Sequence, residues 1–308
     1  MGTSTKSTTG PSVSLAAVPD WCTGTTNTWR WNRFEHCVII ENYVSMVDVV
    51  TGAQIGRTEF TLGHLIRANR DSLRFTEEIS IRRGESYGVM ENDDEMTARM
   101  ISYCATGCSR ELDSDWIPWD YEESVELGNS YDSNVGDGQI ALSRITYEFW
   151  VDHEDAVGDD GWPMTYSSGD VRCDRVPYRT TAGCVTGFHV PTLSHAGLGS
   201  ITQHVISAQS AGKPGRPNQS TLTYDEDDAR SIQRRAAACA SFTPARPGEE
   251  CDEYPFAHTT QGGSNSSTAS VPSSEQRAQG GKFSSFIQNL RVLSGEGFYV
   301  DPYANSHY

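Results

Sequence analysis

Two acidic residues, Asp252 and Glu253, stand side by side directly after Cys251 and shortly before Pro255. The proline excludes a regular helix here and restricts the backbone on either side of it. Adjacent carboxylates that are partly buried repel each other and lose hydration, and a divalent cation offsets both costs. The segment is therefore a candidate metal-dependent catalytic site, and its alternative interpretation is an acidic surface turn.

The eight cysteines occur as four sequence-adjacent pairs, but their spacing alone does not determine the connectivity. No Cys-x2-Cys pair is present, which disfavours structural zinc. Disulfides persist in oxidising compartments, so we expect a secreted, extracellular protein. The simplest pairing joins neighbours: Cys22–Cys37, Cys104–Cys108, Cys173–Cys184 and Cys239–Cys251.

The 308 residues carry a net charge of -17, and a negative charge of this size would repel nucleic acid. The charge is, however, unevenly distributed along the chain. Residues 1–170 hold 12 Lys and Arg against 29 Asp and Glu, whereas residues 171–308 hold 12 of each kind. The length suits two domains. We place an acidic domain of unknown role at 1–165 and a second domain at 170–308, with the Gly-, Ser- and Asp-rich segment 152–170 as linker.

The first domain contains short alternating or β-branched runs separated by turn signals, which predict a mainly β, sandwich-like fold. The runs lie at 36–40, 43–50, 54–62, 86–90, 95–103 and 139–151. The acidic stretch 91–95 lacks the spacing of a calcium loop and is interpreted as a solvated face. No apolar run approaches the ~18 residues needed to cross a bilayer, so no membrane partner is expected. Residues 1–7 are interpreted as a flexible tail, consistent with removal of a signal peptide or a larger precursor.

The second domain changes to helical periodicity, and we predict an α+β fold. Leu198, Ile201, Val205 and Ala208 share one helical face, and Gly212 with Pro214 ends that helix. A second helix is expected to begin near Thr223. A third is marked by the stripe Phe283, Phe286, Ile287 and Leu290, followed by strands at 291–293 and 298–300.

Several stretches between about 187 and 301 agree in order with the NucA/NucB family of secreted bacterial deoxyribonucleases, which this part of the chain resembles. The block around Asp252 is the most specific of them. The stretches are Ser200–Val205 with Ala208, Gly212–Pro214, Arg234–Arg235 with Ala238–Cys239, Cys251–Ala257, Gly262–Gly263, and Val271–Pro272 with Glu275–Arg277 and Gly280–Gly281.

The resemblance implies a metal-dependent endonuclease with a ββα-metal-like active site in which an aspartate replaces the usual histidine base. Asp252 matches that aspartate. Glu275 matches an acidic position expected to bind Mg²⁺ or Mn²⁺, together with Gln276 or Asp252, while Glu253 is a further catalytic candidate. This chain has Gln276 where the family often has Asn, which leaves the second ligand open.

An enzyme that cleaves DNA also needs positively charged side chains to bind the phosphates next to the cleaved bond. Guanidinium and ammonium groups bind these phosphates in any DNA sequence alike. Ordinary surface charge is the alternative for each of the four candidates. His204, His258 and Gln279 could support the site; a buried structural histidine and a loop histidine are the alternatives for His204 and His258. The candidate phosphate contacts are Arg234, Arg235, Arg277 and Lys282.

We therefore expect a secreted, largely sequence-nonspecific endodeoxyribonuclease, active as a monomer on DNA. Two other interpretations stay open. In one, an extracellular binding protein carries a degenerate nuclease domain. In the other, the nuclease is the toxin tip of a larger secreted system and has a cognate inhibitor protein.

Overall fold

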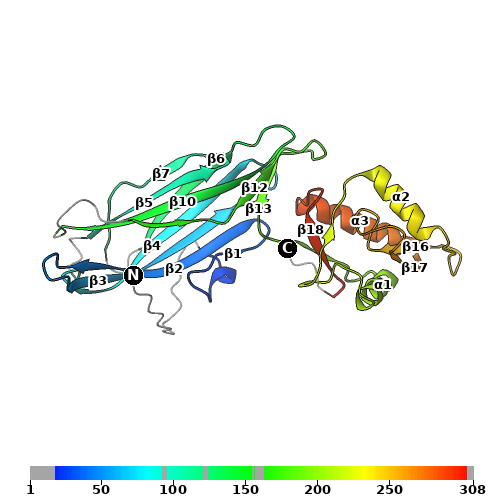
Figure 1. Cartoon of the computed structure of the whole chain (residues 1–308), viewed down its shortest axis with the longest axis horizontal. Coiled ribbons are helices and arrows are strands. Elements are labelled where there is room, and N and C mark those ends of the chain that lie inside the picture. The colour runs from blue at the N-terminus through cyan, green and yellow to red at the C-terminus, as the bar shows by residue number, and fades with distance from the viewer. Residues whose placement is uncertain (1–17, 92–95, 121–123, 155, 157–162, 304–308) are drawn as a thin grey trace. The chain divides into compact units, whose positions relative to one another are not determined.

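The computed structural model describes residues 18–91, 96–120, 124–154, 156 and 163–303 (Figure 1). The tail at 1–7, most of the acidic stretch 91–95 and the Gly- and Asp-rich segment 158–161 lie outside these residues. No helix in the described part of the chain is long and apolar enough to cross a membrane.

The chain divides into two compact units, which we call unit 1 (Met1–Phe188) and unit 2 (His189–Tyr308). The boundary thus follows Phe188 and does not fall in the expected linker at 152–170. The reason is that three short strands after His153 return to unit 1: β11 (Met164–Ser167) and β12 (Val171–Asp174) pair with β10, and β13 (Gly183–Thr186) pairs with β12.

Unit 1 is built from two antiparallel sheets, as the alternating runs predicted (Figure 1). The six-stranded sheet has the order β1 (Arg30–Trp31), β2 (Glu35–Val47), β3 (Gln54–Arg67), β4 (Arg74–Gly88), β9 (Ser124–Ser133) and β6 (Cys108–Ser109). The other has the order β13, β12, β10 (Ile140–His153), β5 (Met96–Thr106) and β7 (Glu111–Asp113), with β11 on β10 and β8 (Ile117–Pro118) on β5. A 3-10 turn, η1 (Asp20–Cys22), precedes them.

The two sheets share one hydrophobic core. In β5, alternate residues such as Met96, Ala98 and Met100 are buried, as expected where one face of a sheet packs inward. Side chains from both sheets belong to the same buried cluster, including Phe60, Leu62, Ile79, Ile145 and Phe149. The N-terminal region is therefore β-rich, with the sandwich-like layering expected.

Unit 2 has an α+β fold, and its described residues, 189–303, form three helices and two small sheets (Figure 1). Strand β18 (Gly297–Asp301) lies between β14 (Thr192–Ser194) and β15 (Leu222–Thr223), while β16 (Glu249–Tyr254) pairs with β17 (Ser267–Pro272). The helices are α1 (Gly199–Ser210), α2 (Asp228–Cys239) and α3 (Ser273–Asn289), and each contacts the β16–β17 hairpin.

The expected helices are present, with shifted limits. The predicted face of α1 is buried at Ile201, Val205 and Ala208. Helix α2 begins only at Asp228, where Asp227 accepts the first-turn hydrogen bond from Arg230 as N-cap. Residues 291–293 form no strand; Arg291 has φ 48°, and the chain turns there after α3 ends.

All four predicted disulfides are formed: Cys22–Cys37, Cys104–Cys108, Cys173–Cys184 and Cys239–Cys251. The last one joins the C-terminal end of α2 to β16. It fixes the backbone of β16 one residue before Asp252.

Candidate active site

Strand β16 carries both acidic residues into the interior of unit 2. Asp252 is 1% exposed and Glu253 is 6% exposed, so the segment is not an acidic surface turn. Neighbouring strand residues point to opposite faces of a sheet. The two carboxylates accordingly meet different partners, one on α1 and the other on α2.

Asp252 is held by hydrogen bonds to both of its carboxylate oxygens. His204 Nδ1, on α1, lies 2.6 Å from Asp252 Oδ2, and His204 Nε2 lies 3.0 Å from the hydroxyl of Ser267 on β17. In the amide orientation that satisfies both neighbours, Gln276 donates to Asp252 Oδ1 at 3.1 Å and accepts from Arg235 at 3.1 Å. Three elements therefore determine where this carboxylate points.

Glu253 faces α2 and forms a clamp with Arg235. The guanidinium Nη1 lies 3.1 and 3.0 Å from the two Glu253 oxygens, and Nη2 donates to the carbonyl of Cys251 at 3.0 Å. Burial raises the pKa of Glu253 to about 7, against the lowering effect of Arg235, and the nearby Asp252 adds to the increase. Arg235 thus links the Glu253 carboxyl to the Gln276 amide beside Asp252.

Glu275, in the first turn of α3, is directed at the start of α1. Its Oε2 accepts a hydrogen bond from the backbone N–H of Ile201 at 3.2 Å. A Cβ atom at Gly199 would lie 2.7 Å from Glu275 Oε1, and Gly199 has φ +43°, so glycine leaves room for this carboxylate. The structure places Gln276, rather than Glu275, in hydrogen-bond contact with Asp252.

The four candidate phosphate contacts fall into two groups. Arg234 bonds Asp225 at 2.7 Å and the carbonyl of Ala257, and Arg235 clamps Glu253, so both are engaged inside the unit. Side-chain hydrogen bonds from Arg230, and then from Arg234, hold the pKa of Asp225 far below its usual value.

The other two candidates are exposed residues of α3. Lys282 is exposed and donates to the carbonyl of Ala196 at 2.9 Å. Arg277 is exposed and has no hydrogen-bond or ion-pair partner among the residues that the structure describes.

The remaining supporting candidates lie apart from this hydrogen-bond network. His258 Nδ1 lies 3.2 Å from the carbonyl of Asp225, and its ring stacks on Phe283. Gln279 is buried, and its Nε2 atom has no partner in the described part of the chain. Tyr254 and Phe256 are buried core residues.

Unit 2 offers the donor atoms that a hard divalent cation requires. A geometric cluster of possible ligands comprises Cys239, Cys251 and Glu253, but the two cysteines are joined in a disulfide and supply no thiolate. Mg²⁺ and Mn²⁺ prefer oxygen, often from one or two carboxylates completed by water and phosphate. Glu275 fits that preference, since the space left by Gly199 accommodates its Oε1, which has no hydrogen-bond partner within the described ranges.

Two contributors were not found from the sequence. Ser267 lies opposite Tyr254 in the β16–β17 register, so only a correct hairpin prediction would have brought it near Asp252. Gly199 precedes the helical stripe and carries no side chain that would signal its role.

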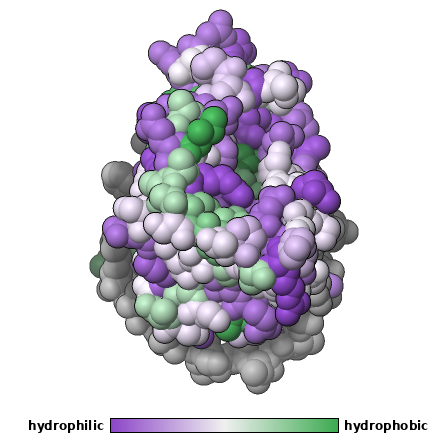
Figure 2. Space-filling model, turned by 90° about the vertical axis from the view of Figure 1, so that its right-hand side faces the viewer, coloured by the Kyte–Doolittle hydropathy of each residue, from purple (hydrophilic) through white to green (hydrophobic). Residues whose placement is uncertain are grey.

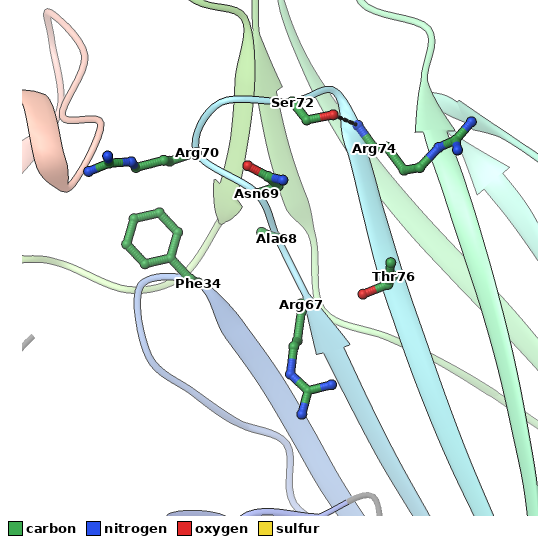
Figure 3. A pocket seen from close by; sticks show the side chains of 8 residues that line it. All are labelled: Phe34, Arg67, Ala68, Asn69, Arg70, Ser72, Arg74 and Thr76. Carbon is green, nitrogen blue, oxygen red and sulfur yellow. Dashed lines mark hydrogen bonds between the residues drawn. The ribbon is translucent and has the colours of Figure 1, made fainter.

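A pocket of about 400 Å³ lies in unit 1, at the loop between β3 and β4 (Figure 3). It contains none of the predicted site residues. Its arginines, Arg67, Arg70 and Arg74, point in different directions, and each pairs with a carboxylate, which argues against an anion site (Figure 3).

Figure 2 shows a second view of the surface, on which hydrophilic residues predominate and hydrophobic ones form small separate groups.

The deoxyribonuclease NucA/NucB family model matches residues 210–301. The match runs from the end of α1 to β18 and includes Asp252, Glu253 and Glu275, while His204 and Gly199 precede it. This match confirms the resemblance of the C-terminal region to a family of deoxyribonucleases, which are hydrolases. No curated protein matches the chain significantly.

Proposed function

We propose that unit 2 is a secreted, divalent-metal-dependent endonuclease that hydrolyses DNA with little regard to sequence. The observation that carries the proposal is the family match over 210–301, which contains the buried pair Asp252 and Glu253. Four disulfides support export, because such bonds persist outside the reducing cytosol.

Asp252 is the general base of this reaction. It accepts a proton from a water molecule whose oxygen attacks phosphorus, while the bond from phosphorus to the leaving sugar oxygen breaks. Asp252 Oδ2 is engaged by His204, so Oδ1, on the side of Gln276, receives the proton. The surrounding hydrogen bonds hold the carboxylate in one orientation before substrate arrives, which is what efficient proton transfer requires.

Glu275 would hold the cation, with Gln276 as the second candidate ligand. When bound, Mg²⁺ or Mn²⁺ neutralises charge on the phosphate and on the leaving oxygen. Arg277 and Lys282, both exposed on α3, bind flanking phosphates, and such contacts carry no sequence information. Arg234 and Arg235 mainly position Asp225 and Glu253.

The test is cleavage of supercoiled plasmid by the oxidised protein with Mg²⁺, with Mn²⁺ and with EDTA. Asp252→Asn keeps the side-chain shape and removes the base, so kcat should fall by about 10²–10⁴-fold with the fold unchanged. Failure of the wild-type protein to cleave with either metal would favour a binding protein with a degenerate nuclease domain.

Glu275→Gln provides a second variant for the same assay. Glutamine keeps an acceptor for the Ile201 N–H but lacks the charge. The metal concentration for half-maximal cleavage should rise more than about tenfold. An unchanged metal requirement would mean that Glu275 only caps α1.

A further inference from the structure

We infer that His204 is a positioning residue for Asp252 in the reaction, an inference that rests on the proposed nuclease function. His204 is 7% exposed and comes from α1, six residues before the family match begins. It reaches Asp252 because α1 packs on both β16 and β17. His204 lies in the stretch Ser200–Val205 that resembles the family, but its role is inferred here from the tertiary contact with Asp252.

The hydrogen bonds assign a single tautomer to the His204 ring. An ionised carboxylate is only an acceptor, so the 2.6 Å contact requires Nδ1 of His204 to carry the proton and donate it to Asp252 Oδ2. The other ring nitrogen, Nε2, then accepts from the hydroxyl of Ser267 at 3.0 Å. The contact with Asp252 thus determines the tautomer, and Ser267 holds the opposite edge of the ring.

This arrangement assigns different tasks to the two oxygens of Asp252. His204 holds Oδ2 in place from the α1 side, which prevents rotation of the buried carboxylate. Oδ1 is left facing the half-buried Gln276, the side on which water is activated. Outer partners that orient a catalytic group in this way typically contribute about 10–100-fold to activity.

The experiment compares His204→Phe with His204→Asn in the full-length oxidised protein. Phenylalanine keeps the ring volume and apolar packing but removes the donor, whereas asparagine keeps an N–H near the position of Nδ1 and fills less space. If His204 positions Asp252, kcat for plasmid cleavage falls about 10–100-fold in His204→Phe with KM within about threefold. His204→Asn then recovers most of the lost kcat.

A purely structural His204 predicts the opposite order, because His204→Phe would pack better and be the more active variant per folded molecule. That order, or full activity in His204→Phe, overturns the inference. Absence of metal-dependent cleavage by the wild-type protein overturns the proposed nuclease function instead.

A readout in the metal-free protein keeps the inference testable even if His204→Phe does not fold. Nitrogen-15 NMR of the His204 ring should show the proton on Nδ1 in the wild type. Ser267→Ala should leave the proton on Nδ1 but loosen the orientation of the ring, and so lower kcat several-fold at constant KM. An Nε2-protonated ring in the wild-type protein contradicts the assignment.

Discussion

Both units bury a histidine against a carboxylate, but they enclose the pair in different ways. In unit 1, His64 Nδ1 lies 3.2 Å from Glu77 Oε1, and both side chains are fully buried. Tyr131 and Tyr147 donate to Glu77 at 2.8 and 2.5 Å, and the hydroxyl of Tyr166 lies 2.7 Å from His64 Nε2. Burial and the Glu77 charge raise the pKa of Tyr131 and Tyr147 well above the usual value, so these hydroxyls stay protonated donors.

In unit 2 the pair formed by His204 and Asp252 is closer, at 2.6 Å, but its remaining contacts come from Ser267 and Gln276, which are only half-buried. Both side chains of the first pair are fully buried, and two of the three enclosing hydroxyls, those of Tyr131 and Tyr147, lie in the core, which leaves little access for water or substrate. A pair enclosed by residues at the surface can exchange one of these contacts for substrate. The comparison favours a structural role for the first pair and supports the catalytic role proposed for the second.

The largest expected effect on stability comes from Glu77→Gln. The amide turns one acceptor oxygen into a donor and leaves a buried hydroxyl or ring nitrogen without its partner. Breaking a buried pair in this way should lower the free energy of unfolding of unit 1 by about 3–5 kcal/mol. All seven tryptophans precede residue 189, so tryptophan fluorescence reports the unfolding of unit 1 selectively.

The same variant tests whether the structural and catalytic roles are separate. Plasmid cleavage by Glu77→Gln should stay within about twofold of wild type wherever unit 1 remains folded, because the Glu77 pair takes no part in the reaction. A tenfold loss of cleavage in such protein would contradict the structural assignment.

Buried polar residues also limited what could be predicted from the sequence. The strands with regular alternation, such as β3 and β5, and the apolar face of α1 were found. The first part of β4 was missed because Glu77 and Arg83, which look solvent-facing, are buried in it. Binary patterning places polar residues outside, so it fails where a core contains a polar network.

The candidate site was predictable only in part, for a similar reason. Asp252 was found from adjacent carboxylates and a specific motif. Its contact with His204 joins residues 48 positions apart in the sequence, and the contact of His204 with Ser267 joins residues 63 positions apart. Helix packing and hairpin register bring them together, and no local pattern specifies either. The exposed or paired state of each arginine depends in the same way on tertiary contacts.

An effect of intermediate size, on the pH dependence of the stability of unit 2, is expected at His195. This buried histidine has no carboxylate partner among the described residues. It is fully buried, and neither ring nitrogen has a partner among the described residues. Burial, reinforced by Lys282, lowers the pKa of His195 from 6.5 to about 3. The unfolded chain therefore takes up a proton below about pH 6.5 while the folded unit does not, so stability present above that pH is lost progressively as the pH falls toward 3.

His195→Phe should remove this pH dependence. Between pH 8 and pH 5, wild-type unit 2 should lose about 2 kcal/mol more stability than the variant. The variant should also be no less stable at pH 8, since it removes an unsatisfied buried polar group. Hydrogen exchange of α1 and α3 amides measures unit 2 separately, and equal pH profiles for the two proteins would show that His195 is hydrated or paired in solution.

The smallest expected effect is on DNA binding, and it distinguishes the exposed Arg277 from Arg234, which is paired with a carboxylate. Arg277 has no partner in the described structure, whereas Arg234 bonds Asp225. With cleavage blocked by Asp252→Asn, Arg277→Ala should weaken duplex binding a few-fold and reduce the slope of log affinity against log salt by about 1. Arg234→Ala, the matched control, should leave that slope unchanged and instead reduce stability, because it leaves the buried Asp225 with less compensation. If both variants changed the salt slope equally, the Asp225 pairing would be broken on DNA binding, and the paired arginines would also count as phosphate contacts.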